Sequence, residues 1–247
     1  MQVGLTKILL SLSLSMFAFI NCTDKVVTPT GIELTLVESI PIAIKELTGI
    51  DFNNDKTKLW IVGENEPKIY LTDLRGTIEK KYDVSQNDME EITSIGDTLL
   101  AVVVEITREI LFLNLKDNSE NVYQTGLEGE LNHGLEGITY LPTEENLFLS
   151  KEKNPKLILK INFNAEILSY SSIDFVEDLA GLYFDQSDNT LWILSQEGNM
   201  IYKCNTEYKI IEQYSIPNNQ CEGVAVKGKN IYLVSDTEQL LRTYLIS

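Results

Sequence analysis

Carboxylates that recur at two positions of a repeated pattern are the residues best suited to chemistry in this sequence. Near the start of one apolar run stand Glu90, Glu136 and Glu222, and at the end of a later run stand Glu64, Glu105, Glu152 and Asp236. Carboxylates brought close together repel one another, which raises their pKa values or recruits a cation. Ca²⁺ suits such a set because it accepts about six to eight oxygen ligands in irregular geometry. We predict the first three as metal ligands and the other four as a ligand-binding rim; the alternative is that all are solvated loop charges or backbone caps.

Two lysines and the single histidine extend this candidate site. Lys68 and Lys156 stand at equal offsets in two similar segments, so we predict both at the rim, where they would receive an anionic group. The alternative is that these lysines only offset neighbouring acids. His133 precedes an expected strand and joins the rim as a candidate general base, although no partner for it is visible. The sequence has no nucleophile elbow, Walker loop, dinucleotide fingerprint or Cys/His metal cluster.

A repeat of about 42 to 46 residues must position these side chains. Its marker is a short signature whose third residue is Gly49, Glu91, Gly137, Gly181 or Gly223, at steps of 42, 46, 44 and 42 residues. Each signature leads into short runs rich in Ile, Leu, Val, Tyr and Trp, which turn residues separate. No window inside the repeats has a helical apolar period. Four short strands per unit are typical of a β-propeller blade.

The predicted fold is therefore an all-β, five-bladed β-propeller built from four-stranded antiparallel blades. The last unit contains only three strands, and we expect the alternating segment Ile32–Val37 to complete it and close the ring. Strands alternate in direction within a blade, so both sets of carboxylates should lie at one mouth of the central channel. Trp60, Phe148, Trp192 and Tyr232 recur at one blade position and are expected in the core. The alternative fold is a pair of stacked sandwich domains.

The first residues of the chain predict an export signal. Lys7 precedes the apolar stretch Ile8–Ile20, which is shorter than the roughly 20 residues of a spanning helix. Cys22 then resembles the lipidated cysteine of a bacterial lipobox, and buried acyl chains would hold the protein to a membrane surface. We expect a lipoprotein signal peptide over residues 1–21, a tether over 22–31 and the propeller over 32–247. The alternative is an ordinary signal peptide with Cys22 incidental.

The remaining cysteines and the composition exclude several classes of protein. In the blade arrangement Cys204 and Cys221 fall on opposite faces, so we predict two separate thiols. With 37 acidic and 20 basic side chains, a net charge of −17 argues against nucleic acid as a partner. A hydrophobic content of 43% is enough for a core, whereas 3 cysteines and 14 glycines exclude disulfide-dense and collagen-like chains.

Four segments in this order resemble a known family: Asn132–Ile138, Lys151–Pro155, Asp178–Leu182 and Cys221–Ala225. They make the chain similar to the SdiA-regulated (YjiK-like) proteins from about Leu47 to Ile246. The resemblance implies a propeller, an exported or membrane-attached location, and a relation to esterase-like and phytase-like propellers. It implies no catalytic residue.

The sequence therefore leaves three functions open. The first is a protein of the bacterial cell envelope, lipid-anchored to a membrane and facing the periplasm or exterior. It would bind an unknown small molecule or protein at the acidic mouth, with Ca²⁺. The second is a Ca²⁺-assisted hydrolase of phosphate or other esters, and the third is a scaffolding lipoprotein.

Overall fold

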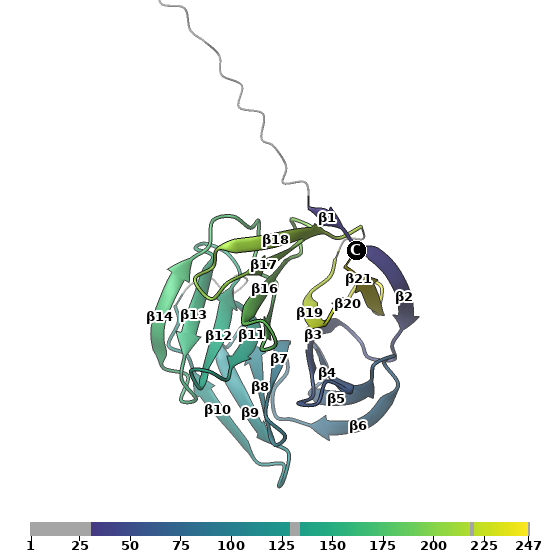
Figure 1. Cartoon of the computed structure of the whole chain (residues 1–247). Coiled ribbons are helices and arrows are strands. Elements are labelled where there is room, and N and C mark those ends of the chain that lie inside the picture. The colour runs from purple at the N-terminus through teal and green to yellow at the C-terminus, as the bar shows by residue number, and fades with distance from the viewer. Residues whose placement is uncertain (1–30, 129–133, 218–219, 247) are drawn as a thin grey trace, which may run out of the picture.

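The computed structural model describes residues 31–128, 134–217 and 220–246, which form β-strands and connecting turns with no helix. Sixteen antiparallel or parallel strand pairings arrange the strands into five sheets. The sheets stand around a central axis as the blades of a propeller (Figure 1). The predicted all-β, five-bladed fold with four-stranded antiparallel blades is confirmed.

The strands fall into four radial positions, and blades 1 to 5 are numbered by their inner strands. The inner strands are β3 (Leu47–Phe52), β7 (Met89–Ile95), β11 (Leu135–Leu141), β15 (Gly181–Asp185) and β19 (Gly223–Lys227). The second strands are β4 (Lys58–Gly63), β8 (Leu99–Val104), β12 (Asn146–Lys151), β16 (Thr190–Ser195) and β20 (Asn230–Ser235). The third strands are β5 (Lys68–Asp73), β9 (Glu109–Asn114), β13 (Leu157–Ile161), β17 (Met200–Cys204) and β21 (Leu240–Leu245). The outer strands are β6 (Ile78–Asp83), β10 (Glu120–Gln124), β14 (Ile167–Ser172), β18 (Ile210–Ser215) and β2 (Thr35–Pro41).

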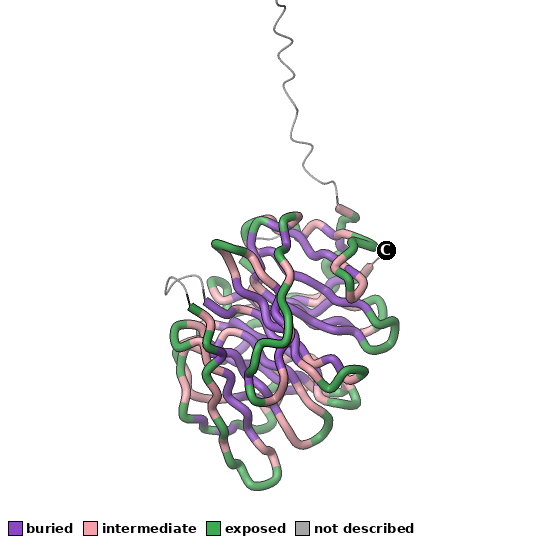
Figure 2. Tube along the Cα trace, turned by 90° about the vertical axis from the view of Figure 1, so that its left-hand side faces the viewer, coloured by how far each residue is buried: buried purple, intermediate pink, exposed green. Residues whose placement is uncertain are grey.

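The inner and second strands are the most buried, and the outer strands are the most exposed. Every residue of β3 and of β16 is buried, because neighbouring blades cover both faces of these strands. Five of the six residues of β14 are exposed. Figure 2 shows the buried segments running through the middle of the disc and the exposed segments at its turns and perimeter. The four aromatic residues expected in the core are at most 6% exposed, which confirms that prediction.

In three blades the inner strands approach one another so closely that the glycine of the signature has no room for a side chain. A Cβ atom on Gly49 would lie 2.5 Å from the Cα of Glu91. A Cβ atom on Gly181 would lie 2.7 Å from the carbonyl oxygen of Glu222. A Cβ atom on Gly223 would lie 2.7 Å from the carbonyl oxygen of Thr48. Glycine therefore lets adjacent inner strands touch at the axis. Blade 2 has Glu91 at this position, and its side chain is directed into the ring.

The N-terminal segment closes the ring, with one correction to its bounds. The outer strand of blade 5 is β2, which pairs antiparallel with β21 from Thr35↔Leu245 to Pro41↔Leu240. The prediction placed all of Ile32–Val37 in this strand, but β1 (Ile32–Glu33) instead pairs parallel with β18 of blade 4. Between them Leu34 is only 2% exposed and packs in the core, so the chain crosses from one blade to the next there. An alternating pattern indicates a strand but does not specify which sheet edge it joins.

Two further observations concern the cysteines and the membrane. Cys204 and Cys221 are both buried free thiols, which confirms the prediction of two separate groups. Burial raises the pKa of Cys204 to about 12 and that of Cys221 to about 11, so both are unreactive. Among the described residues, no helix is long and apolar enough to cross a bilayer.

Candidate functional site

A cavity of about 210 Å³ opens at the channel mouth where the inner strands begin. Eight of the eleven described residues that line it are carboxylic acids, and none is basic. The eight are Glu64, Glu90, Glu105, Glu136, Glu152, Asp178, Glu222 and Asp236. The structure thus brings together all seven carboxylates that the repeat pointed to and adds Asp178. Thr48, Ala180 and Gln196 complete the lining.

Irregularities at the start of the inner strands direct part of this set toward the axis. In blades 1, 2 and 3 the register between the inner and second strands shifts at the signature, between Leu47 and Ile50, Met89 and Ile92, and Leu135 and Ile138. Such β-bulges leave a residue outside the ladder and redirect its side chain. Glu90 and Glu136 stand inside these bulges, which explains why their side chains reach the cavity from a strand that is otherwise core.

Backbone hydrogen bonds hold the acids that follow the second strands. The backbone N–H of Glu64 donates to the carbonyl of Glu46 at 2.9 Å, and that of Glu105 donates to the carbonyl of Asp88 at 3.1 Å. In blade 3 the N–H of Glu152 donates to the carbonyl of Gly134 at 3.2 Å. Each bond ties the end of a second strand to the loop that enters an inner strand. The same connection in three blades places three carboxylates at equivalent points around the mouth.

Most acids at the mouth have no basic partner among the described residues, and the pKa values of several of them are raised. Burial, followed by the charges of neighbouring carboxylates, raises the pKa of Glu90 and of Glu136 well above the usual range. Burial and the nearby charges of Asp236 and Glu64 raise the pKa of Glu222 to about 8, although the Gln196 side chain donates a hydrogen bond to it at 3.0 Å. The pKa of Glu105 is raised by burial as well. At neutral pH part of this set therefore keeps its protons.

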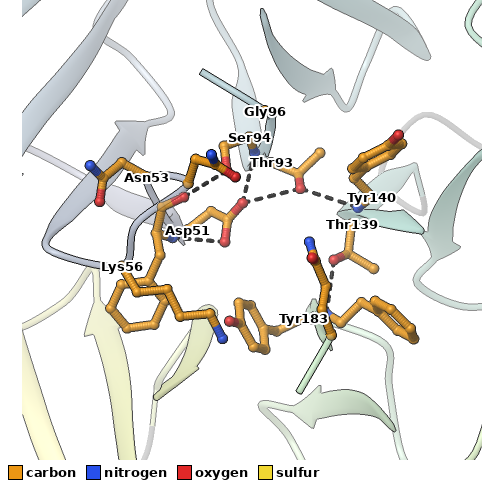
Figure 3. Close-up of a pocket in the computed structure, with 13 residues that line it drawn as sticks. Asp51, Asn53, Lys56, Thr93, Ser94, Gly96, Thr139, Tyr140 and Tyr183 are labelled. Carbon is orange, nitrogen blue, oxygen red and sulfur yellow. Dashed lines mark hydrogen bonds between the residues drawn. The ribbon is translucent and has the colours of Figure 1, made fainter. Parts of the chain in front are cut away.

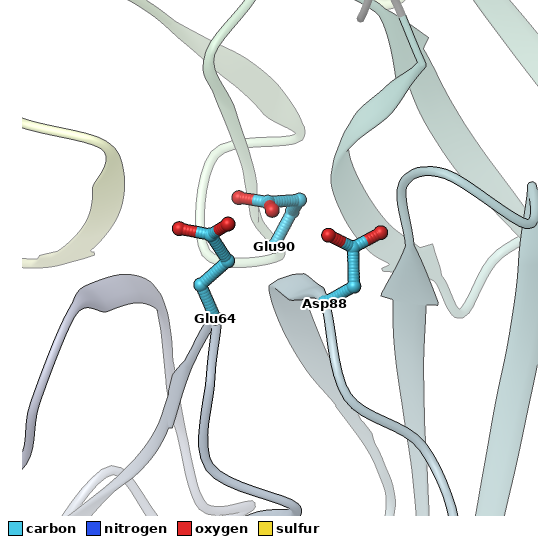
Figure 4. Close-up of side chains that lie close together, drawn as sticks. All are labelled: Glu64, Asp88 and Glu90. Carbon is cyan, nitrogen blue, oxygen red and sulfur yellow. The ribbon is translucent and has the colours of Figure 1, made fainter. Parts of the chain in front are cut away.

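Three carboxylates at one side of the mouth are close enough to share a cation. Carboxylate oxygens of Glu64, Asp88 and Glu90 all lie within 4.8 Å of one another (Figure 4). Asp88 is fixed there because its N–H donates to the carbonyl of Glu64 at 2.6 Å and its Oδ2 accepts the N–H of Ile106, also at 2.6 Å. Glu136 and Glu222 line the cavity but are not part of this trio. The tightest group of oxygens therefore lies between blades 1 and 2.

Glu91 separates this mouth from the far end of the channel. Its carboxylate accepts the backbone N–H of Ile50 at 2.7 Å through Oε1, while the buried Oε2 has no hydrogen-bond partner among the described residues. Oε2 lies 3.2 Å from the point that a Cβ on Gly181 of blade 4 would occupy, so the side chain crosses the ring. Burial raises the pKa of Glu91 well above the usual range. We interpret Glu91 as a protonated, neutral side chain that blocks the channel between its two mouths.

Sequence reasoning missed Asp88 and Asp178, although the repeat carried a signal for both. They stand three residues before the glycine position of blades 2 and 4, and Glu46 stands at the same place in blade 1. Asp178 is 1% exposed, and its Oδ1 accepts the hydroxyl of Ser195 at 2.5 Å and the N–H of Glu197 at 3.1 Å. Acidic residues therefore recur at a third position of the repeat, and the sequence alone shows this.

Other predicted site residues do not line the cavity. The Lys68 ammonium lies 3.8 Å from Asp83, and that of Lys156 donates to the carbonyl of Val176 at 2.6 Å, so neither of these lysines faces the acids. A different lysine of the described part of the chain, Lys153, pairs with a lining residue: its Nζ lies 2.7 Å from Glu152 and 2.8 Å from Glu197. His133 and Cys22 lie outside the described residues, as do the predicted signal peptide and nearly all of the tether. Their roles stay predictions.

A five-bladed propeller with a carboxylate-lined channel mouth is the class of protein that this fold and site define. Among proteins of known families, the match is to the SdiA-regulated family, whose model covers residues 27–241. The chain belongs to that family, and the resemblance seen in the sequence is confirmed.

Solved structures add support for the fold alone. Glutaminyl cyclase from Myxococcus xanthus is similar with a TM-score of 0.69 and 10% identity, covering 88% of this chain and 100% of that one. A chain of a nidogen/laminin complex is similar with a TM-score of 0.57 and 19% identity, covering 77% and 72% of the two chains. At these identities the shared feature is the arrangement of strands.

The raised pKa values predict that stability falls as the pH rises from about 5.5 to about 8. An acid whose pKa is higher in the folded than in the unfolded state stabilises the fold fully below its unfolded pKa of about 4.3, and loses that contribution as the pH rises through the folded pKa. The window reaches the value of about 8 for Glu222. Urea unfolding in chelator-containing buffer should therefore show a loss of about 1–3 kcal/mol across it.

The double variant Glu136→Gln with Glu222→Gln should flatten this pH dependence, because amides do not titrate. Glu33→Gln, at an exposed position of β1, is the matched control and should leave it unchanged. A wild-type free energy of unfolding that stays constant or rises from pH 5.5 to pH 8 would contradict the electrostatic description of the mouth.

Proposed function

We propose that this chain is a lipid-anchored protein of the bacterial cell envelope that binds a ligand or partner at its acidic mouth through Ca²⁺. The observation that carries the proposal is the accumulation of eight lining carboxylates with no basic lining residue among the described ones. A set of uncompensated charges of this kind is stabilised by a cation. The bound cation would then offer open coordination positions to oxygen atoms of a ligand.

The donor set favours calcium over a transition metal. The lining offers carboxylate, hydroxyl and amide oxygens, but no thiol or imidazole among the described residues. Hard oxygen donors suit Ca²⁺ and Mg²⁺, and the unequal spacing of the acids suits the larger ion, which tolerates irregular geometry. Glu64, Asp88 and Glu90 provide the closest trio of oxygens, and other acids of the mouth surround it.

Binding is better supported than ester hydrolysis. The hydrolase interpretation needed Lys68 and Lys156 to hold an anionic substrate group. Both lysines contact other groups instead, and neither lines the cavity. The Lys153 ammonium, which does reach a lining acid, is already held between Glu152 and Glu197.

Calcium should raise the melting temperature of the wild-type protein by about 5–10 °C. A ligand present at about a hundred times its Kd adds about 2.7 kcal/mol to the free energy of unfolding, and 1 kcal/mol shifts Tm by about 2–4 °C for a chain of this size. Calorimetry or dye-based thermal unfolding at pH 7.5, with and without calcium, measures the shift. Magnesium should give a smaller one.

Variants then locate the ion and test the proposal. Glu64→Gln with Glu90→Gln should abolish the calcium-dependent rise if the trio holds the cation. Glu136→Gln with Glu222→Gln should abolish it only if the cation lies on the axis, as first predicted for Glu90, Glu136 and Glu222. Glu33→Gln is again the neutral control. No rise in Tm for the wild-type protein at millimolar calcium would contradict the cation proposal.

The distribution of exposed apolar residues supports attachment to a membrane surface. Of the ten described large hydrophobic residues that are exposed, eight lie on the perimeter strands β1, β2, β14 and β18, and a ninth, Leu245, lies next to β2. These strands occupy the half of the ring that contains β1, where the described part of the chain begins (Figure 1). The opposite outer strands β6 and β10 carry none. An apolar half around β1 fits a protein whose edge rests against lipid.

Fluorescent labelling of the lipid-anchored full chain on phosphatidylcholine vesicles tests this placement. The variants Tyr170→Cys on β14 and Lys80→Cys on β6 introduce exposed thiols on opposite halves, while the buried native thiols stay unlabelled. A polarity-sensitive label at position 170 should shift to the blue and be quenched by spin-labelled lipid, and a label at position 80 should not. Equal behaviour of the two labels would contradict the orientation, and a mass spectrum showing unmodified Cys22 would contradict the anchor.

A further inference from the structure

One repeat position links successive blades at the far end of the channel. It lies two residues after the glycine position and is occupied by Asp51, Thr93 and Thr139 in blades 1 to 3. Each side chain accepts a backbone N–H from the inner strand of the next blade: from Ser94 at 2.7 Å, from Tyr140 at 3.1 Å and from Phe184 at 2.9 Å. Figure 3 shows these hydrogen bonds. In three blades, therefore, the side chain at this position holds the next blade in place through a hydrogen bond.

Tyr183 breaks this series in blade 4. It is 4% exposed, and its hydroxyl makes no hydrogen bond to any described residue. The hydroxyl is not among the buried polar atoms that lack a partner, so water reaches it through the cavity. The side chain reaches a cavity of about 70 Å³ at the mouth opposite the acidic one (Figure 3). Burial raises the pKa of Tyr183, so the hydroxyl keeps its proton and remains a hydrogen-bond donor. A ligand atom that accepts a hydrogen bond from this hydroxyl would take the place of water there.

Lys56 brings a positive charge to the same cavity. It belongs to the turn between β3 and β4 of blade 1, and its ammonium reaches across the ring to Asp185 of blade 4 at 3.1 Å and to the carbonyl of Val226 of blade 5 at 3.5 Å. The ammonium also lies 5.4 Å from the centre of the Tyr183 ring. Two of its three N–H groups have partners in these contacts, so the third is available to a ligand.

The cavity offers donors, whereas its strongest acceptors are already occupied. Asp51 accepts the N–H of Phe52 at 2.7 Å through Oδ1, and through Oδ2 it accepts the N–H of Ser94 at 2.7 Å and the hydroxyl of Thr93 at 3.1 Å. The Asp185 carboxylate faces Lys56. A ligand that only accepts hydrogen bonds therefore suits this mouth, in contrast to the acidic mouth.

We propose that this second mouth binds the carboxylate end of a small molecule, held by the Lys56 ammonium and the Tyr183 hydroxyl. A volume of about 70 Å³ exceeds what one water needs and accommodates a group of a few heavy atoms. The rest of the ligand would project toward solvent past Asn53 and Gln186, which also line the cavity. The site is separate from the cation proposed for the acidic mouth, because the two cavities share no lining residue.

Titration of the isotope-labelled full chain with acetate, at constant ionic strength, tests the site by two-dimensional NMR. Acetate should shift the amide signals of Phe52, Ser94 and Phe184 with a saturable curve, and methylammonium should not. Tyr183→Phe removes only the hydroxyl and should weaken acetate binding about tenfold, and Lys56→Gln should abolish saturation. Tyr170→Phe makes the same chemical change on exposed β14 and should have no effect.

Two results would overturn the site. One is a linear, unsaturated response of the wild-type protein to acetate, which indicates an adventitious additive only. The other is unchanged acetate affinity in Tyr183→Phe, provided that its thermal unfolding matches the wild type. Acetate should leave the calcium-dependent rise in Tm unaltered, so failure of this site and failure of the cation site are separate outcomes.

Discussion

The close contact of five inner strands around one axis is the constraint on which the rest of the structure depends. Adjacent strands touch at the signature position, where a Cβ on Gly181 or Gly223 would come within 2.7 Å of a neighbouring carbonyl oxygen. This contact makes the ring narrow, and a narrow ring forces the side chains before and after the glycine position to converge. Carboxylates that lie more than a hundred residues apart in the sequence, such as Glu64 and Glu222, therefore line one cavity.

The repeat builds the ring, and the places that depart from it carry the candidate chemistry. Glu91 stands where four blades have glycine and blocks the channel between its two mouths. Tyr183 stands where three blades have a side chain that accepts a hydrogen bond from the next blade, and its hydroxyl is left to a ligand. The two ends of the channel consequently differ in character. One presents uncompensated carboxylates, and the other presents an ammonium and a phenol hydroxyl.

The radial architecture could be predicted from the sequence because the period and the alternating apolar runs are local signals. The gathering of Glu90, Glu136 and Glu222 followed from strand direction alone. Distances within the mouth did not, because bulges at the signatures and the path of the loops decide which oxygens meet. Asp88 lies in such a loop, and its place beside Glu64 depends on its backbone hydrogen bond to Glu64 of the neighbouring blade and on the bond from Ile106 to its carboxylate. Lys68 and Lys156 share an offset in the repeat, but the local contacts of each ammonium direct them away from the cavity.

A crystal structure of the full chain grown with calcium would show whether the narrow ring assembles a cation site. We predict a density peak about 2.3–2.6 Å from carboxylate oxygens of Glu64, Asp88 and Glu90. We also predict that this peak disappears from crystals soaked in chelator. Well-ordered carboxylates at the mouth with no peak in saturating calcium, or a basic side chain folded into the cavity in place of an ion, would contradict this prediction.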